Sequence, residues 1–176
     1  DGTGISKETD WKPESLRMPK IRWRYALGEG HSAVCVSGKR LYTMGNLGGK
    51  DVVYCLDVET GKDVWKYGVL CSAGNYSGPR ATPVLDGGLL YTLHRDGQVF
   101  AFEAEKGAVK WRKHLTDDYK AVAGMWGFSG SPLVLGDALW FNARSAGLAL
   151  DKATGARLRE SNGGQCGYAA PVLFQQ

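Results

Sequence analysis

Three nine-residue segments align without a gap, and their spacing constrains the fold more than any other feature of the sequence. They cover residues 53–61, 99–107 and 147–155. Each holds a short apolar stretch, then an acid, then a turn that closes on glycine, and the glycines stand 46 and then 48 residues apart. Glycine accepts the positive φ that such turns require. A period of this length indicates a repeat protein whose units stack on one another.

A second apolar module precedes each of these segments. Its starts read Ser32-Ala-Val, Thr82-Pro-Val, Ser131-Pro-Leu and Ala170-Pro-Val. After each of the first three, a glycine turn leads into another apolar strand, so one unit reads as four short strands joined by turns. No stretch keeps a helical period. Four short strands per repeat of this length predict an all-β fold, a β-propeller built from four-stranded antiparallel blades.

The repeat predicts about three and a half blades. We expect an N-terminal extended segment at 1–20, a lone outer strand at 21–27, and a lone inner strand within a partial blade at 168–176. The full blades are predicted at about 31–68, 80–114 and 130–160. Closed propellers have roughly 4–8 blades. We therefore expect an incomplete propeller, part of a longer protein, which would self-associate through its open blade faces if it ended at Gln176.

A tryptophan follows the repeat glycine in two of the three units. Trp65 and Trp111 hold this position, and the third unit has Arg159 there. A ligand-binding tryptophan would be unique to one blade, whereas a recurring one is expected to bury its ring against the adjacent blade. We assign blade-docking roles to the following residues of the repeat: Asp57, Gly61, Trp65, Gly107, Trp111, Asp151 and Gly155.

The first repeat carries a resemblance to a known family. Residues 55–65 read Cys-Leu-Asp-Val-Glu-Thr-Gly-Lys-Asp-Val-Trp. This resembles the tryptophan-docking motif Ala-x-Asp-x-x-Thr-Gly-Lys-x-x-Trp of the pyrroloquinoline quinone (PQQ)-like repeat, and residues 101–111 and 149–159 match it more weakly. The opening, Asp1-Gly-Thr-Gly-Ile-Ser, is similar to the start of a bacterial exported subgroup. The resemblance implies a PQQ-like β-propeller in a periplasmic or otherwise exported protein.

The resemblance implies two functional classes. Some members are quinoprotein dehydrogenases that oxidise alcohols or sugars, and others, such as an outer-membrane assembly lipoprotein, bind protein partners without a cofactor. The alcohol-oxidising members carry adjacent cysteines over the quinone and a Glu-Asn-Asp set around calcium, and this sequence shows neither. We therefore predict a non-catalytic binding or scaffold module without a cofactor. The alternative is a PQQ-dependent dehydrogenase with PQQ and calcium on the propeller axis, and a third reading is a carbohydrate-binding accessory protein.

The connections between blades are the least repetitive stretches and the expected place for a ligand site. They run over residues 28–31, 71–80, 123–130 and 163–169, near the propeller axis. The alternative is that they only make turns, because polar and aromatic loop residues are common without function. The expected partner is a small ligand or a protein on this axial face, or the remaining blades of a full-length propeller. The candidate binding residues are Glu29, His31, Asn75, Tyr76, Arg80, Trp126, Ser129 and Tyr168.

Charge and motif content exclude several functions. The net charge of +4 comes from scattered basic residues mixed with 18 acids, so no nucleic-acid surface is predicted. No apolar run approaches the ~20 residues of a membrane span. No catalytic residue and no metal site is predicted, and His94 and His114 receive no role.

The cysteines are expected to be free thiols. Cys35, Cys55, Cys71 and Cys166 are widely spaced and form no Cys-x-x-Cys pair. Cys35 falls in a first strand and Cys55 in a third, which places them too far apart for a disulfide. Cys71 and Cys166 lie in connections one blade apart.

Overall fold

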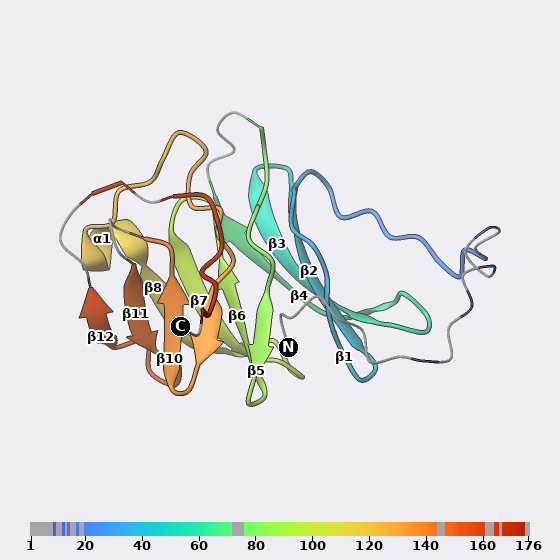
Figure 1. Ribbon diagram of the computed structural model, residues 1–176. Coiled ribbons are helices and arrows are strands. Elements are labelled where there is room, and N and C mark those ends of the chain that lie inside the picture. The colour runs from blue at the N-terminus through green and yellow to red at the C-terminus, as the bar shows by residue number, and fades with distance from the viewer. Residues whose placement is uncertain are drawn as a thin grey trace.

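Three four-stranded antiparallel sheets stand side by side in the computed structural model (Figure 1). The structure describes residues 9, 12, 14, 17, 20–71, 76–143, 147–160, 164–165 and 167–174. Within each sheet the strands follow one another in chain order, joined by consecutive hairpins. The predicted all-β architecture of four-stranded blades, forming an incomplete propeller, is confirmed.

The blades contain twelve strands and one short helix among the described residues. Blade 1 consists of β1 (Cys35–Ser37), β2 (Arg40–Leu47), β3 (Lys50–Asp57) and β4 (Asp63–Leu70). Blade 2 consists of β5 (Val84–Asp86), β6 (Leu89–Leu93), β7 (Gln98–Glu103) and β8 (Val109–His114), followed by α1 (Leu115–Tyr119). Blade 3 consists of β9 (Leu133–Leu135), β10 (Ala138–Phe141), β11 (Leu148–Asp151) and β12 (Arg157–Glu160). No helix in this part of the chain has the length and hydropathy that a membrane crossing needs.

The two segments expected as lone strands are not strands in the structure. Residues 21–27 and 169–174 form no ladder with any described strand. A strand needs a hydrogen-bonded neighbour, and each of the three described sheets ends at its own first and fourth strands without adding a further strand. Residues 21–27 instead lie against blade 1, where the rings of Tyr25 and Tyr54 meet edge to face at 5.5 Å.

The repeated turn joins the third strand to the fourth in each blade. In blade 1 the carboxylate of Asp57 accepts hydrogen bonds from the backbone N–H of Thr60 at 2.9 Å and from its hydroxyl at 2.8 Å. Gly61 closes the turn with φ +67°. Blade 3 repeats the arrangement with Asp151 and Thr154. These bonds replace ladder bonds that the chain loses as it reverses direction.

Each tryptophan of the repeat docks on the turn of the next blade. The indole N–H of Trp65 donates to the carbonyl of Ala104 at 2.7 Å, and that of Trp111 donates to the carbonyl of Lys152 at 3.0 Å. A Cβ placed on Gly107 would lie 2.6 Å from the Trp65 ring. The ring of Trp65 therefore occupies space that is open only because residue 107 is a glycine. Trp111 is buried, and Trp65 is half-buried.

The sequence analysis missed a third docking tryptophan. Trp23 donates its indole N–H to the carbonyl of Val58 at 2.8 Å. A Cβ on Gly61 would lie 2.5 Å from its ring. The available signal was its position, 42 residues before Trp65. Trp23 thus attaches residues 21–27 to blade 1 as Trp65 attaches blade 1 to blade 2.

Gly107→Ala is expected to destabilise the protein by more than about 1 kcal/mol, because the new Cβ meets the Trp65 ring and Gly107 has φ +71°. Gly68→Ala in β4 is the matched control, since its Cβ would enter open space. Urea unfolding of both variants measures the difference. Equal effects would contradict the docking geometry.

Two apolar clusters fill the spaces between blades. The one between blades 1 and 2 includes Tyr42, Cys55 and Phe102, and the one between blades 2 and 3 includes Tyr91 and Trp111. Neither face of an isolated blade could be buried by the blade itself, so stacking supplies the core. Cys35, Cys55 and Cys71 are free thiols, as predicted, and Cys166 lies outside the described residues.

Cys55 and Cys71 are expected to resist alkylation in the folded protein. Burial raises the pKa of Cys55 to about 11 and that of Cys71 to about 12, so almost no reactive thiolate exists near pH 8. Cys35 is only half-buried and should react first. Mass spectrometry after timed iodoacetamide treatment tests the order, and modification of Cys71 before Cys35 would contradict it.

Candidate functional site

The blade connections gather at one end of the blades, here called the loop end. It comprises the junctions 28–31, 76–80 and 123–130 together with the β2–β3 hairpin, and it lies at the top of Figure 1. Because strand direction alternates, the docking turns that follow β3, β7 and β11 lie at the opposite end, here called the turn end. Blade docking and the candidate ligand residues are therefore separated by the length of a strand.

Four of the eight predicted site residues line one shallow pocket at the loop end. They are His31, Tyr76, Arg80 and Trp126, around a volume of about 390 Å³. Tyr76 and Trp126 come from different junctions, and their rings meet edge to face at 5.3 Å, a geometry that aromatic pairs favour. The pocket therefore joins residues that lie far apart in the sequence.

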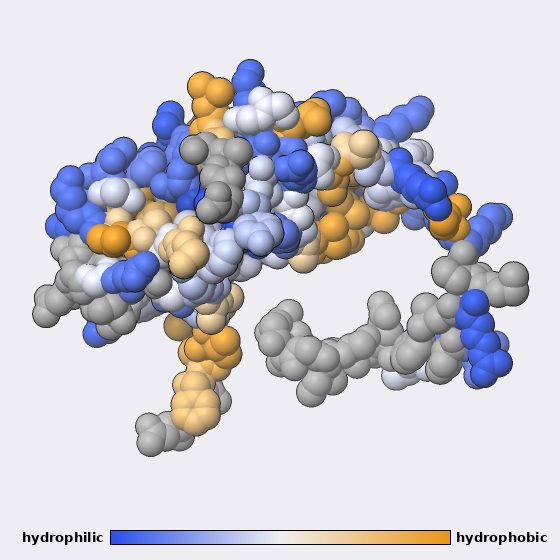
Figure 2. Space-filling model, turned by 90° about the horizontal axis from the view of Figure 1, so that it is seen from above, coloured by the Kyte–Doolittle hydropathy of each residue, from blue (hydrophilic) through white to orange (hydrophobic). Residues whose placement is uncertain are grey.

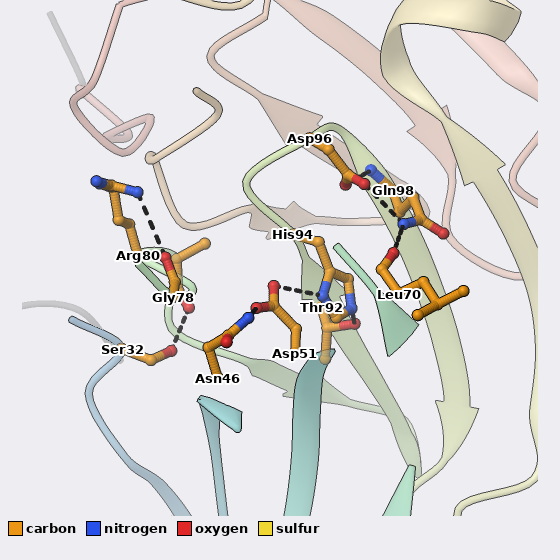
Figure 3. Close-up of polar contacts among 11 residues, drawn as sticks. Ser32, Asn46, Asp51, Leu70, Gly78, Arg80, Thr92, His94, Asp96 and Gln98 are labelled. Atoms are coloured by element: carbon orange, nitrogen blue, oxygen red, sulfur yellow. Dashed lines mark hydrogen bonds and ion pairs between the residues drawn. The ribbon is translucent and has the colours of Figure 1, made fainter. Parts of the chain in front are cut away.

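Backbone carbonyls hold the guanidinium of Arg80. Its two terminal nitrogens donate to the carbonyls of Tyr76, at 2.9 Å, and Gly78, at 3.3 Å. Burial and the nearby charge of Arg95 lower the pKa of Arg80, while the charge of Asp51 raises it. Figure 3 shows the guanidinium at the end of its side chain, pointing away from Asp51 and the sheets. Two backbone carbonyls thus fix the orientation of the Arg80 guanidinium, and the charge of Arg95 acts on it.

The strand register corrects the alignment of the inner strands. Cys35 pairs with Tyr42 as Val84 pairs with Tyr91, so Ser32 is equivalent to Ala81, one residue earlier than the sequence pattern suggested. Hydrogen bonds across the blades agree, since the backbone N–H of Ala33 donates to the hydroxyl of Thr82 at 3.2 Å. The corrected register places these residues at equivalent positions just before successive inner strands: His31, Arg80, Ser129 and, by the sequence pattern, Tyr168.

Three of the other predicted residues, Glu29, Ser129 and Tyr168, lie outside the described lining of this pocket. The hydroxyl of Ser129 is buried without a hydrogen-bond partner among the described atoms. Tyr168 packs on Gly124, whose added Cβ would lie 2.4 Å from the tyrosine oxygen. Glu29 forms a backbone bridge with Asn46, with bonds of 2.9 and 2.6 Å. Asn75 lies outside the described residues.

A buried polar cluster between blades 1 and 2 was also missed by the sequence analysis. Asp51 accepts a hydrogen bond from the side-chain amide of Asn46 at 2.8 Å, and its other oxygen lies 3.0 Å from Nδ1 of His94. Nε2 of His94 lies 3.4 Å from the hydroxyl of Thr92. Figure 3 shows Asp51 and His94 facing each other across the two blades. The signal in the sequence was that His94 takes the place of Gly45 in the otherwise similar β2 and β6.

The environment of Asp51 favours its charged form. Burial raises its pKa, but the hydrogen bonds from His94 and Asn46 outweigh burial, and the pKa is lowered. Asp51 is 1% exposed and His94 is fully buried. A ligand at the surface cannot reach either group. The cluster therefore joins the two blades.

The described residues near the pocket offer few acidic side chains. Within the described part of the chain, no three histidine, cysteine or acidic side chains gather as a metal site. The pocket is lined by Arg80, His31 and two aromatic residues, without an acid among its described lining.

Solved structures similar to the chain share its fold. They include a europium-containing methanol dehydrogenase, with TM-score 0.58, 21% identity and coverage of 78% of this chain and 26% of that one. A quinohemoprotein alcohol dehydrogenase from Comamonas testosteroni has TM-score 0.59, 22% identity and coverage of 78% and 22%. BamB from Moraxella catarrhalis has TM-score 0.55, 22% identity and coverage of 74% and 36%. At these identities the likeness shows the fold alone, and the chain spans well under half of each relative.

A comparison with curated proteins finds no significant match. A family model does match, over residues 2–164, and its description is outer membrane protein assembly factor BamB. The match covers nearly all of the described blades, including every docking turn. The repeat, the four-stranded blades and this match together place the chain in the PQQ-like repeat family of β-propellers.

Proposed function

We propose that this chain is part of a non-catalytic protein-binding module in an exported bacterial protein, and that a partner protein docks on its loop end. One observation carries the proposal. Tyr76 and Trp126 from separate junctions pair over a pocket that Arg80 and His31 also line. Tyrosine, tryptophan and arginine are the residues that most often dominate the binding energy of protein interfaces.

Exposed apolar side chains at the loop end support a protein partner. Leu47 is 62% exposed in the β2–β3 hairpin, Leu70 is 74% exposed at the end of β4, and Met125 is 72% exposed beside Trp126. Figure 2 looks onto this end and shows hydrophobic patches between hydrophilic ones. Apolar groups next to charged groups are typical of protein docking surfaces.

The architecture supports the same proposal. Backbone hydrogen bonds anchor the junctions, such as that from the N–H of Glu29 to the carbonyl of Asn46 in β2 at 2.9 Å and that from the N–H of His31 to the carbonyl of Pro79 in the next junction at 2.8 Å. A rigid scaffold that holds side chains in place reduces the entropy lost on binding. The description of the matching family, an assembly factor, also favours a protein partner over a substrate.

A peptide-display selection on the intact protein tests the proposal. We expect the selected peptides to lose at least about tenfold in affinity when Trp126 or Tyr76 is replaced by alanine, as hot-spot residues do. Phe174→Ala is the matched control, because this aromatic side chain is 82% exposed outside the loop end, and it should leave affinity unchanged. Peptides that bind equally well to Trp126→Ala would contradict the proposal.

The dehydrogenase alternative has its own test. The intact protein is incubated with PQQ, calcium, primary alcohols and an artificial electron acceptor, and reduction of the acceptor is followed. We expect no reduction above the rate without protein, because the described loop end lacks an accessible carboxylate cluster. Protein-dependent reduction would overturn the non-catalytic proposal.

A further inference from the structure

The pocket at the loop end has a concentration of positive charge. Arg95 lies close enough to Arg80 for its charge to lower the pKa of Arg80. Its Nε donates to the carbonyl of Trp126 at 3.4 Å, and the indole of Trp126 lines the pocket. Each residue of the aromatic pair thus accepts a hydrogen bond from an arginine: the carbonyl of Tyr76 from Arg80, and the carbonyl of Trp126 from Arg95.

Asp51 and Asp96 are each hydrogen-bonded to other side chains. Asp51 is the acid whose charge acts on Arg80, and it is buried and hydrogen-bonded to Asn46 and His94. Asp96 accepts a hydrogen bond from the side chain of Gln98 at 2.8 Å. No described residue that lines the pocket is acidic. The mouth of the pocket therefore favours an incoming anion.

We propose that this pocket recognises a carboxylate of an acidic side chain on the partner protein, with an apolar or aromatic neighbour of that side chain against Tyr76 and Trp126. The inference rests on the proposed function and names the chemistry of the partner segment. Guanidinium groups bind carboxylates through charge-assisted hydrogen bonds. The carbonyls of Tyr76 and Gly78 fix the orientation of Arg80 before the partner arrives, which reduces the entropy lost on binding.

A protein segment fits better than a free small anion. A free anion would gain from Arg80 and Arg95 but would leave the side chain of Tyr76, which is 68% exposed, uncovered. The exposed Met125 and Leu70 extend the apolar surface beyond the pocket. An acidic residue followed by apolar residues would contact both the charged and the apolar parts of the loop end.

Fluorescein-labelled peptide pools test the inference. The pools share random flanking positions and carry a fixed Glu, Asp, Gln or Asn at the centre, and binding to the intact protein is followed by anisotropy. We expect the Glu and Asp pools to bind at least about tenfold more tightly than the Gln and Asn pools. This preference should weaken as salt rises from roughly 0.05 to 0.5 M, because screening reduces the attraction.

Two variants assign the preference to the pocket. Arg80→Gln should abolish the difference between the Glu and Gln pools. Arg112→Gln is the matched control, since this exposed arginine lies over Phe100 at the edge of blade 2, and it should retain the difference. Pools that bind equally, with binding lost in Trp126→Ala, would overturn the carboxylate inference and leave the docking proposal standing. If no pool depended on Trp126, both would be overturned.

Discussion

Trp111→Ala is expected to lower the free energy of unfolding by about 3–5 kcal/mol, the usual cost of truncating a large buried aromatic residue. The indole fills the space above Gly155 and donates to the carbonyl of Lys152. Alanine would leave a cavity between blades 2 and 3, and the carbonyl of Lys152 would keep only the hydroxyl of Tyr91 as a donor, at 3.1 Å. Trp65→Ala should fall in the same range, towards its lower end, because Trp65 is only half-buried.

Chemical unfolding followed by circular dichroism measures this effect. Arg159→Ala is the matched control, because Arg159 holds the same repeat position in blade 3 and is exposed. It should change the free energy of unfolding by no more than about 0.5 kcal/mol, as most surface substitutions do. Trp111→Phe should recover part of the loss by restoring apolar contact without the N–H donor. An unfolding midpoint for Trp111→Ala equal to that of Arg159→Ala would contradict the docking role.

Asp51→Ala is expected to destabilise the protein by about 1–3 kcal/mol for each buried group it leaves without a hydrogen-bond partner, and both the ring of His94 and the amide of Asn46 lose theirs. The pair joins blades 1 and 2, so its loss weakens the contact between blades as well as the fold of blade 1. A double-mutant cycle with His94→Ala measures the coupling. Asp63→Asn, at an exposed carboxylate in β4, is the control and should have a small effect.

The same pair predicts a dependence of stability on pH. The pKa of Asp51 is lower in the folded protein than in the unfolded chain, where it is about 3.9. Its contribution is therefore present above about pH 4 and lost as pH falls through the folded pKa. Stability of Asp51→Asn should fall less steeply in acid than that of the natural protein. Parallel acid profiles for the two proteins would contradict the assignment.

The fold could be predicted because the same pattern of an apolar stretch, an acid and a glycine turn occurs three times in the sequence. The turn at Asp57–Gly61 needs an acceptor and a positive φ, and the sequence shows both requirements directly. Trp23 was missed because no segment similar to residues 53–61 precedes it in the given sequence, so no repeat context marked it. The inner strands were misaligned by one residue because Ser32-Ala-Val and Thr82-Pro-Val look alike, and only the ladder fixes the register.

The site could be predicted only in part. Loop residues at blade junctions were candidates by position, and four of them do line one pocket. That Tyr76 and Trp126 meet depends on how two junctions fold over each other, which no local pattern encodes. The Asp51–His94 pair is a contact between different blades at non-equivalent repeat positions. An alignment of the repeats compares only equivalent positions, so it could not predict this contact.

Site-specific photo-cross-linking in the native host tests the central claim most directly. A photoreactive amino acid replaces Met125 at the loop end or Lys39 in the β1–β2 hairpin at the turn end, both of which are exposed. A partner that docks on the loop end predicts a discrete cross-linked protein from position 125, lost when Trp126→Ala is added, and none from position 39. Cross-linking from position 39 alone, or cross-linking at position 125 that survives Trp126→Ala, would contradict the account.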